Sequence, residues 1–148
     1  MILNRRHFVK NFCVACLGAP FIGTLGSSCS STHYVTGTLE QTGISVAHAE
    51  FNMTPDTAPT FRQYIIVKND KLVYPICLYR FSEMEYSALL MKCTHQGTEL
   101  QAAGDHLHCP AHGSEFNSAG KVTLGPAEEH LRTFRVVATP DKLLIELN

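Results

Sequence analysis

The sequence predicts an all-β domain. Three observations lead to this expectation: short runs rich in β-branched and aromatic residues, turn-forming residues between those runs, and no long apolar pattern at helical spacing beyond residue 28. With 148 residues, of which 45% are hydrophobic and 17% charged, the chain is long enough for one domain with a substantial core and too short for two. We therefore expect one β domain, residues 29–148, behind a distinct N-terminal segment.

The β-rich runs give the predicted strands. In chain order these are residues 34–39, 43–49, 63–68, 72–80, 86–92, 131–138 and 142–147. Residues 40–42 and 69–70 separate neighbouring runs in the manner of hairpin turns, and residues 139–141 join the last two. Residues 54–59, which contain two prolines, and residues 120–126, which are rich in turn-formers, should be loops.

The N-terminal segment, residues 1–28, has the plan of an export signal or membrane anchor. Arg5, Arg6 and Lys10 form a charged start, and an apolar stretch at 11–25 follows. That stretch is shorter than the roughly 20 residues that span a bilayer comfortably. The paired arginines resemble a twin-arginine signal, and the residues before Cys29 resemble the end of a lipoprotein signal. We expect an exported protein at the outer face of the cytoplasmic membrane or in the periplasm, held by an uncleaved anchor or by acylation of Cys29.

The charge of the domain argues against a nucleic-acid partner. From Cys29 onward the chain has 9 Lys and Arg residues against 13 Asp and Glu residues. Binding to phosphates requires a clustered basic face, which this composition does not provide.

Cysteine and histidine residues form a quartet that predicts a metal centre. Cys93 and His95 are followed, after a gap of 13 residues, by Cys109 and His112. Two thiolates and two imidazoles suit either a tetrahedral zinc ion or iron with sulfide. Each half contributes one cysteine and one histidine, whereas zinc fingers usually place both cysteines first. This pairing favours a two-iron cluster, in which the cysteines hold one iron and the histidines the other.

The spacing of the quartet resembles the Rieske family, whose pattern is Cys-x-His followed by Cys-x-x-His. Cys93, His95, Cys109 and His112 match it, and Ser114 occupies the position of a family serine that bonds a cluster sulfide. The resemblance implies a [2Fe-2S] cluster of Rieske type. It also implies an antiparallel β-sandwich with a small cluster-binding subdomain made of two loops. Residues 125–127 are similar to the proline-bearing loop that covers the cluster in respiratory members.

Neighbouring positions imply an intermediate reduction potential. Rieske centres span about −150 to +300 mV, and hydrogen-bond donors to the sulfurs raise the value. Ser114 is retained, but Phe116 stands where high-potential members have a tyrosine. Thr98 and Ala111 stand where respiratory members carry two disulfide-forming cysteines. We expect a potential below the respiratory proteins and above the oxygenase-type ferredoxins.

A complete set of four protein ligands predicts a one-electron carrier rather than a catalyst that binds substrate. Its partner would be a cytochrome or a larger oxidoreductase subunit, such as one of the arsenite oxidase type. An alternative is the iron-sulfur subunit of a quinol-oxidising complex, although Gln96 replaces an apolar leucine of that class. A further alternative is a zinc-stabilised binding module without a redox role. A ferredoxin serving an aromatic-ring oxygenase conflicts with export, because those oxygenases work in the cytoplasm.

Other cysteines and histidines have simpler explanations. His106 and His108 share one face of a strand and are expected at the surface, because the quartet is already complete. Cys77 lies in an apolar run and should be a small buried hydrophobic residue.

Overall fold

A computed structural model describes residues 32–53 and 60–147, which form strands and one 3-10 helix and no α-helix. The elements are β1 (Tyr34–Thr36), β2 (Thr38–Leu39), β3 (Gly43–Ala47), η1 (His48–Phe51), β4 (Tyr64–Lys68), β5 (Ile76–Arg80), β6 (Tyr86–Leu90), β7 (Gln101–Ala103), β8 (His106–His108), β9 (Glu115–Asn117), β10 (Val122–Leu124), β11 (Thr133–Phe134), β12 (Val136–Ala138) and β13 (Lys142–Glu146). The all-β prediction is confirmed.

Two of the sequence predictions fall outside this part of the chain. The leader, including Cys29, and the loop at 54–59 are not among the described residues. Within the residues that the structure does describe, no helix is long and apolar enough to cross a membrane.

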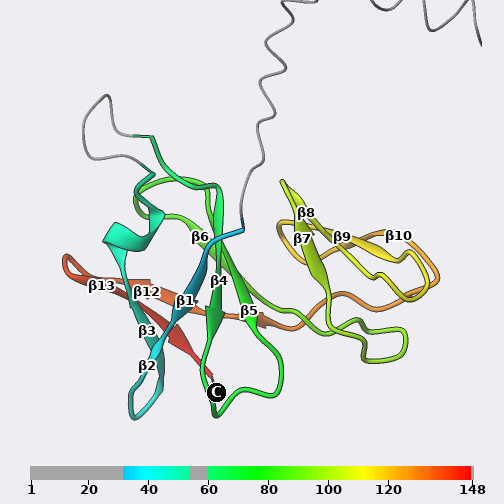
Figure 1. Cartoon of the computed structure of the whole chain (residues 1–148), viewed down its shortest axis with the longest axis horizontal. Coiled ribbons are helices and arrows are strands. Elements are labelled where there is room, and N and C mark those ends of the chain that lie inside the picture. Colours follow the sequence, from blue (N-terminus) through cyan, green and yellow to red (C-terminus); the bar gives the residue numbers. More distant parts are fainter. Residues whose placement is uncertain (1–31, 54–59, 148) are drawn as a thin grey trace, which may run out of the picture. The chain divides into compact units, whose positions relative to one another are not determined.

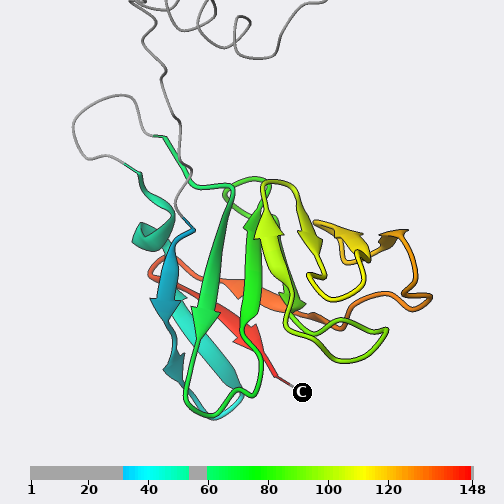
Figure 2. The same ribbon diagram turned by 45° about the vertical axis from the view of Figure 1, so that its right-hand side comes forward.

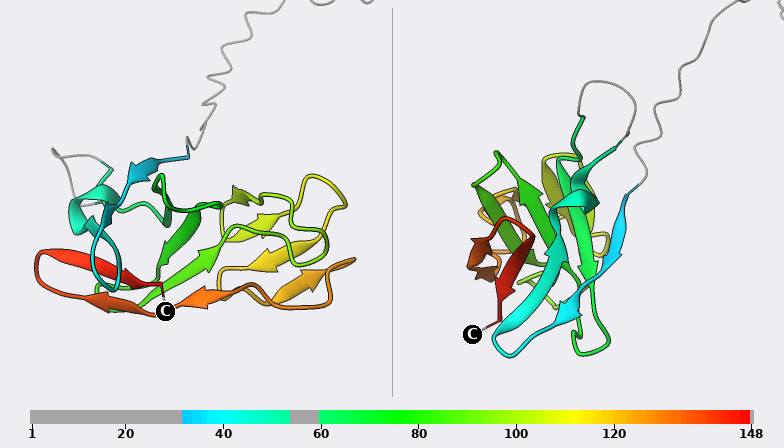
Figure 3. Two further views of the ribbon diagram at one scale, coloured as in Figure 1. Left: turned by 90° about the horizontal axis from the view of Figure 1, so that it is seen from below. Right: turned by 90° about the vertical axis from the view of Figure 1, so that its left-hand side faces the viewer.

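Two sheets form a sandwich. The first has the strand order β1-β4-β5-β6-β11 and the second the order β12-β13-β3-β2. Pairing is antiparallel throughout these sheets except between β1 and β4, which are parallel. Figure 3 shows the second sheet, with β3 in cyan and β13 in red, lying beside the green strands of the first. Buried side chains of both sheets, among them Ile44, Ile65 and Leu143, form one core cluster between them.

The central strands of the first sheet are buried on both faces. Along β4, Ile65 and Val67 face the second sheet, whereas Ile66 belongs to a second core cluster on the opposite side. Along β5, Leu78 likewise faces the second sheet, and Cys77 belongs to the second core cluster. Because successive side chains of a strand point to opposite faces, burial on both sides requires a continuous apolar run, which is what these strands contain.

The second core cluster lies beneath a third, small sheet. This sheet has the strand order β10-β9-β8-β7, and its strands pair antiparallel. Figures 1 and 2 show it in yellow and orange, beside β5 and β6. Leu107 and Phe116, both fully buried, pack with Cys77, Tyr79 and other residues of the first sheet. The predicted sandwich with a small subdomain is therefore confirmed.

One predicted strand, residues 34–39, is two strands in two different sheets. The chain changes sheet at Gly37, between β1 and β2. A Cβ atom at Gly37 would lie 2.2 Å from Ile44 Cγ2 and 2.9 Å from Val67 Cγ1, so only glycine fits the crossing. The predicted strand 131–138 is divided in the same manner, into β11 and β12 of different sheets.

Two other predicted strands are shorter than expected. The run 43–49 leaves the sheet at Ala47 and continues as the 3-10 helix η1, which buries Phe51 in the sandwich core. The run 72–80 pairs with its neighbours only from Ile76, directly after Pro75, whose ring leaves no backbone N–H for the ladder.

Candidate metal centre

Two loops with the same hydrogen-bonded frame carry the quartet. In the first, the Cys93 N–H donates to Thr98 O and the Gly97 N–H donates to Cys93 O, each at 2.8 Å. In the second, the Cys109 N–H donates to Ser114 O at 2.8 Å and the Gly113 N–H donates to Cys109 O at 2.9 Å. Both glycines have a φ of 77°, a value that glycine adopts without strain. Each half of the quartet therefore lies in a tight turn that contains a glycine.

The small sheet and β6 hold these loops side by side. The first loop follows β6 and is closed at its base by a bridge between Lys92 and Glu99. The second loop connects β8 to β9, which pair directly with each other. The first loop is thus closed by an isolated bridge and the second by a strand pair, which gives the quartet's side chains a rigid support.

The four side chains form two pairs of like groups. Cys93 and Cys109 are each 1% exposed and belong to the same core cluster. His95 and His112 are exposed, and their ring centroids lie 5.0 Å apart with the planes at 83°. Among the described residues, no three His, Cys, Asp or Glu side chains are gathered as a single metal ion would require. The arrangement is a buried thiol pair below an exposed imidazole pair.

The surroundings of Cys109 favour the thiolate that binds metal. Burial raises the pKa of its thiol, but the N–H groups of Ala111 and His112 and the side chains of Cys93 and Thr98 hydrogen-bond the sulfur. The hydrogen bonds together outweigh burial, so the pKa lies below its ordinary value. A lowered pKa makes the sulfur a better iron ligand at neutral pH.

Ser114 links the second ligand loop to the proline-bearing loop. Its side chain is fully buried, and its Oγ accepts a hydrogen bond from the Ala127 N–H at 3.0 Å. Because that bond uses an acceptor site of the hydroxyl, the hydroxyl proton is free to be donated to another acceptor. A cluster sulfide is an acceptor of the kind this donor needs, so Ser114 fits the group that the resemblance implies.

Two hydroxyl groups hold the first ligand loop from outside. Thr94 Oγ1 donates to Glu129 O at 2.7 Å, and the Tyr74 hydroxyl donates to Gly97 O, also at 2.7 Å. Sequence reasoning did not identify either contact, because both join segments that are far apart in the chain.

The residues that the sequence singles out beside the quartet differ in burial: Phe116, Thr98 and Ala111. Phe116 is fully buried in the core under the two cysteines, and Ala111 is exposed. Thr98 is half-buried.

His106 and His108, expected at the surface, are half-buried, because they lie on one face of β8 on either side of the fully buried Leu107. The expectation that Cys77 is buried is confirmed. His106 Nδ1 lies 3.2 Å from Asp105 Oδ1. Cys77 is fully buried, and burial raises the pKa of its thiol. None of the three belongs to the paired groups described above.

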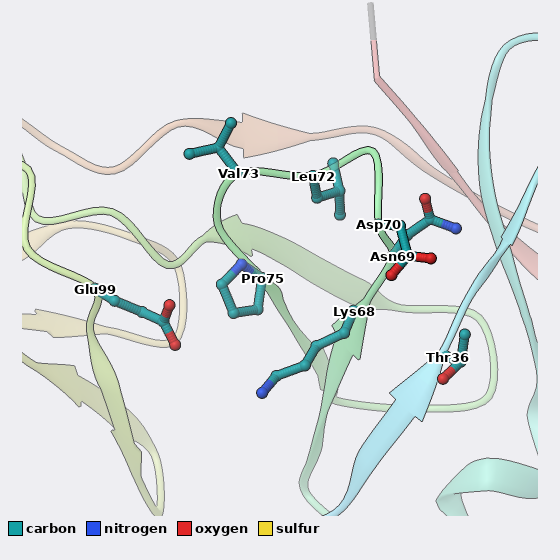
Figure 4. A pocket seen from close by; sticks show the side chains of 8 residues that line it. All are labelled: Thr36, Lys68, Asn69, Asp70, Leu72, Val73, Pro75 and Glu99. Carbon is teal, nitrogen blue, oxygen red and sulfur yellow. The ribbon is translucent and has the colours of Figure 1, made fainter.

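A separate hollow of about 330 Å³ lies beside β1 and the connection from β4 to β5 (Figure 4). It is lined by Thr36, Lys68, Asn69, Asp70, Leu72, Val73, Pro75 and Glu99. These residues include no member of the quartet. Val73 is 88% exposed, so the rim of this hollow is open to solvent.

The part of the chain that contains the quartet resembles known proteins. A family model of the Rieske [2Fe-2S] domain matches residues 54–135. The chain is 35% identical over 71 residues to the mitochondrial Rieske subunit of the cytochrome b-c1 complex of Gorilla gorilla gorilla, which covers 46% of this chain and 26% of that protein. It is 38% identical over 55 residues to the cytochrome b6-f complex iron-sulfur subunit of Synechococcus elongatus, covering 36% of this chain and 31% of that protein. The chain thus spans about a quarter to a third of these relatives.

Solved structures also superpose on this chain. The cyanobacterial plasma membrane Rieske protein from Synechocystis PCC 6803 superposes with a TM-score of 0.50 at 26% identity, covering 57% of this chain and 86% of that chain. The apo form of a quaternary ammonium Rieske monooxygenase superposes with a TM-score of 0.53 at 20% identity, over 72% of this chain and 33% of that chain. The second likeness concerns the fold alone.

Proposed function

Because the chain belongs to the Rieske [2Fe-2S] domain family, we propose that its quartet binds the [2Fe-2S] cluster of that family. Cys93 and Cys109 would hold one iron, and His95 and His112 the other. The observation that carries this proposal is the pairing of like with like, since both thiols are buried in one core cluster and the imidazole centroids are 5.0 Å apart. When bound, a cluster of this type supplies a one-electron redox couple.

The proposed role of the chain is to carry electrons. Four protein ligands complete the coordination, so no position is left for a substrate. The buried cysteines anchor the site in the core, and the exposed imidazole edges present it to a partner. Gln96, which follows His95 in the chain, and Pro110, which precedes His112 by two residues, are exposed and would belong to the contact face.

We propose a larger redox protein as the partner, either a cytochrome or an oxidoreductase subunit. Support comes from relatives named as subunits of the cytochrome b-c1 and b6-f complexes. Gln96 is exposed beside His95, and its polar amide weakens the case for an apolar quinol pocket. Affinity purification from membranes tests the choice: a co-purifying cytochrome b favours a quinol-oxidising complex, and a molybdenum subunit favours a separate oxidoreductase.

We also propose that residues 1–28 direct the domain to the outer face of the cytoplasmic membrane or the periplasm. Support comes from the charged and apolar parts of this segment and from the cysteine at position 29. Cell fractionation with mass spectrometry of the N-terminus tests it. An acylated Cys29 identifies a lipoprotein, an intact N-terminus identifies an anchor, and a protein found only in the cytoplasm contradicts export.

Spectroscopy of the purified protein tests the cluster assignment. We expect a red-brown protein that bleaches with dithionite and gives a [2Fe-2S] EPR signal when reduced. Cys93→Ser and His112→Ala should lose the colour, whereas the matched controls Cys77→Ala and His106→Ala should keep it. A colourless protein with stoichiometric zinc would favour the zinc-binding alternative. Redox titration of the same sample tests the proposed intermediate potential, which a value at either end of the family range would contradict.

A further inference from the structure

The two ligand loops share a backbone frame but differ in what lies against it. In each, the glycine N–H donates to the carbonyl of the cysteine four residues earlier, and both glycines have a φ of 77°. A Cβ atom added at Gly113 would meet no atom of the described residues within 4 Å. At Gly97 the same atom would lie 3.3 Å from Lys92 Cε and 3.8 Å from the Tyr74 hydroxyl oxygen. The glycine of the first loop is therefore packed against another part of the domain, and that of the second is not.

Tyr74 reaches the first loop through a hydrogen bond at this glycine. Its hydroxyl donates to Gly97 O over 2.7 Å. Gly97 therefore uses both of its backbone groups: the N–H bonds Cys93 O within the loop, and the carbonyl accepts from a side chain 23 residues away. Tyr74 is half-buried, so water competes less for this bond than it would at an exposed site.

The base of the same loop is tied to the same short segment of chain. Pro75, which directly follows Tyr74, accepts a hydrogen bond at its carbonyl oxygen from the Met91 N–H at 2.9 Å. The Lys92 ammonium lies over the Tyr74 ring, 5.6 Å from its centroid. Met91 and Lys92 directly precede the ligand loop. The segment therefore contacts the chain on both sides of residues 93–96.

These contacts bear on His95, which lies between them. His95 is exposed, and its ring packs against that of His112, which is exposed as well. The direction of the His95 imidazole therefore depends on the backbone that carries it, from Cys93 to Gly97. Cys93 is buried in the core, and Gly97 is held by Tyr74. One end of this backbone stretch is fixed by burial and the other by a hydroxyl group.

We propose that Tyr74 is a positioning residue for the metal centre: by donating its hydroxyl to Gly97 O, it holds the His95 imidazole in the direction that an iron ligand requires. The inference rests on the proposed function, because it takes His95 as a ligand of the cluster. Contacts of this kind orient a ligand without touching the metal, and metal sites depend on them.

Tyr74→Phe in the cluster-loaded full chain tests the proposal, because it removes the hydroxyl and keeps the ring beside Lys92. The matched control is Tyr34→Phe. Tyr34 also has a lysine over its ring, with Lys68 Nζ 4.1 Å from the centroid, but it lies on β1 at the edge of the first sheet. Hydrogen exchange of peptides that span residues 93–99 measures opening of the loop. The EPR line width of the reduced protein measures how uniformly iron is ligated, an iron chelator measures the rate of cluster loss, and urea unfolding measures global stability.

In Tyr74→Phe we expect hydrogen exchange of residues 93–99 and cluster loss to accelerate about two- to tenfold, the factor that corresponds to one lost hydrogen bond. The EPR lines should broaden, because the imidazole then takes a range of directions. Tyr34→Phe should match the parent protein in all of these measurements.

Parent-like exchange and EPR lines in Tyr74→Phe would overturn the proposal, and so would equal changes in Tyr34→Phe. A lower urea midpoint with unchanged EPR lines would also overturn it, because the hydroxyl would then support the fold and not the ligand. If the parent protein itself gives no [2Fe-2S] signal, the proposed function fails and this inference fails with it. If the parent signal is present and Tyr74→Phe leaves it unchanged, the role of Tyr74 alone fails.

Discussion

Replacement of Ser114 by alanine tests the tie between the second ligand loop and the proline-bearing loop. The serine is fully buried, Ala127 is 4% exposed, and the hydrogen bond between them is 3.0 Å long. Alanine leaves the Ala127 N–H buried without its acceptor. An unsatisfied buried donor costs about 1–3 kcal/mol. We expect Ser114→Ala to lower the free energy of unfolding by about that amount.

Urea unfolding of the cluster-loaded protein measures this effect. With a denaturant slope of roughly 2 kcal/mol per molar, a loss of about 2 kcal/mol moves the midpoint down by roughly 1 M. Far-UV circular dichroism follows the strands, and visible absorbance of the same samples follows the cluster. The slope should stay unchanged, because the substitution does not alter how much surface is buried.

Ser82→Ala is the matched control. Ser82 Oγ also accepts from backbone N–H groups, those of Met84 at 3.3 Å and Glu85 at 3.0 Å, but this turn is exposed. Water replaces the lost acceptor there, so we expect a change within about 0.5 kcal/mol. Equal losses in the two variants, or an unchanged midpoint in Ser114→Ala, would refute the reasoning from burial.

Three further predictions use the same unfolding assay. Gly37→Ala should lose about 1–3 kcal/mol, because the added methyl group overlaps side chains across the sandwich; a parent-like midpoint would contradict this packing. Leu107→Ala should lose about 2–5 kcal/mol, because it empties a fully buried position under the ligand loops; a loss below about 1 kcal/mol would show that the site is loosely packed. Burial raises the pKa of the Cys77 thiol above its ordinary 9.0, so above that pH the unfolded chain loses a proton that the folded protein keeps. Stability should therefore be unaffected by this thiol below pH 9 and fall by about 1.4 kcal/mol per unit above it. Cys77→Ala should reduce that slope, and an identical slope in the variant would argue against the burial of Cys77.

The strands were predictable where their apolar runs are long. Residues 64–68 and 86–90 lie inside predicted runs because a sheet buried on both faces leaves a continuous apolar signal. The parallel pairing of β1 with β4 was not predictable, because it depends on which segments meet across a long stretch of chain. Nor was the change of sheet at Gly37, whose cause is the proximity of Ile44 and Val67 in space.

The sequence spacing singles out the cysteine and histidine quartet, but its surroundings were not predictable. Cysteine and histidine side chains in this pattern carry a chemical signal of their own, and the structure places the two cysteines in one core cluster and the two imidazole rings 5.0 Å apart. The bond from Thr94 to Glu129 carries no such signal. Threonine is common in β proteins, and only the folded arrangement shows which of its hydroxyls supports the loop.

Both loops of the quartet have the same backbone frame, although the histidine takes a different place in each. The same two hydrogen bonds close both frames, although the histidine stands two places after Cys93 in one and three places after Cys109 in the other. One backbone frame therefore occurs with the histidine at either of two places. For protein design, this makes the position of the imidazole a variable that can be tested separately from the frame.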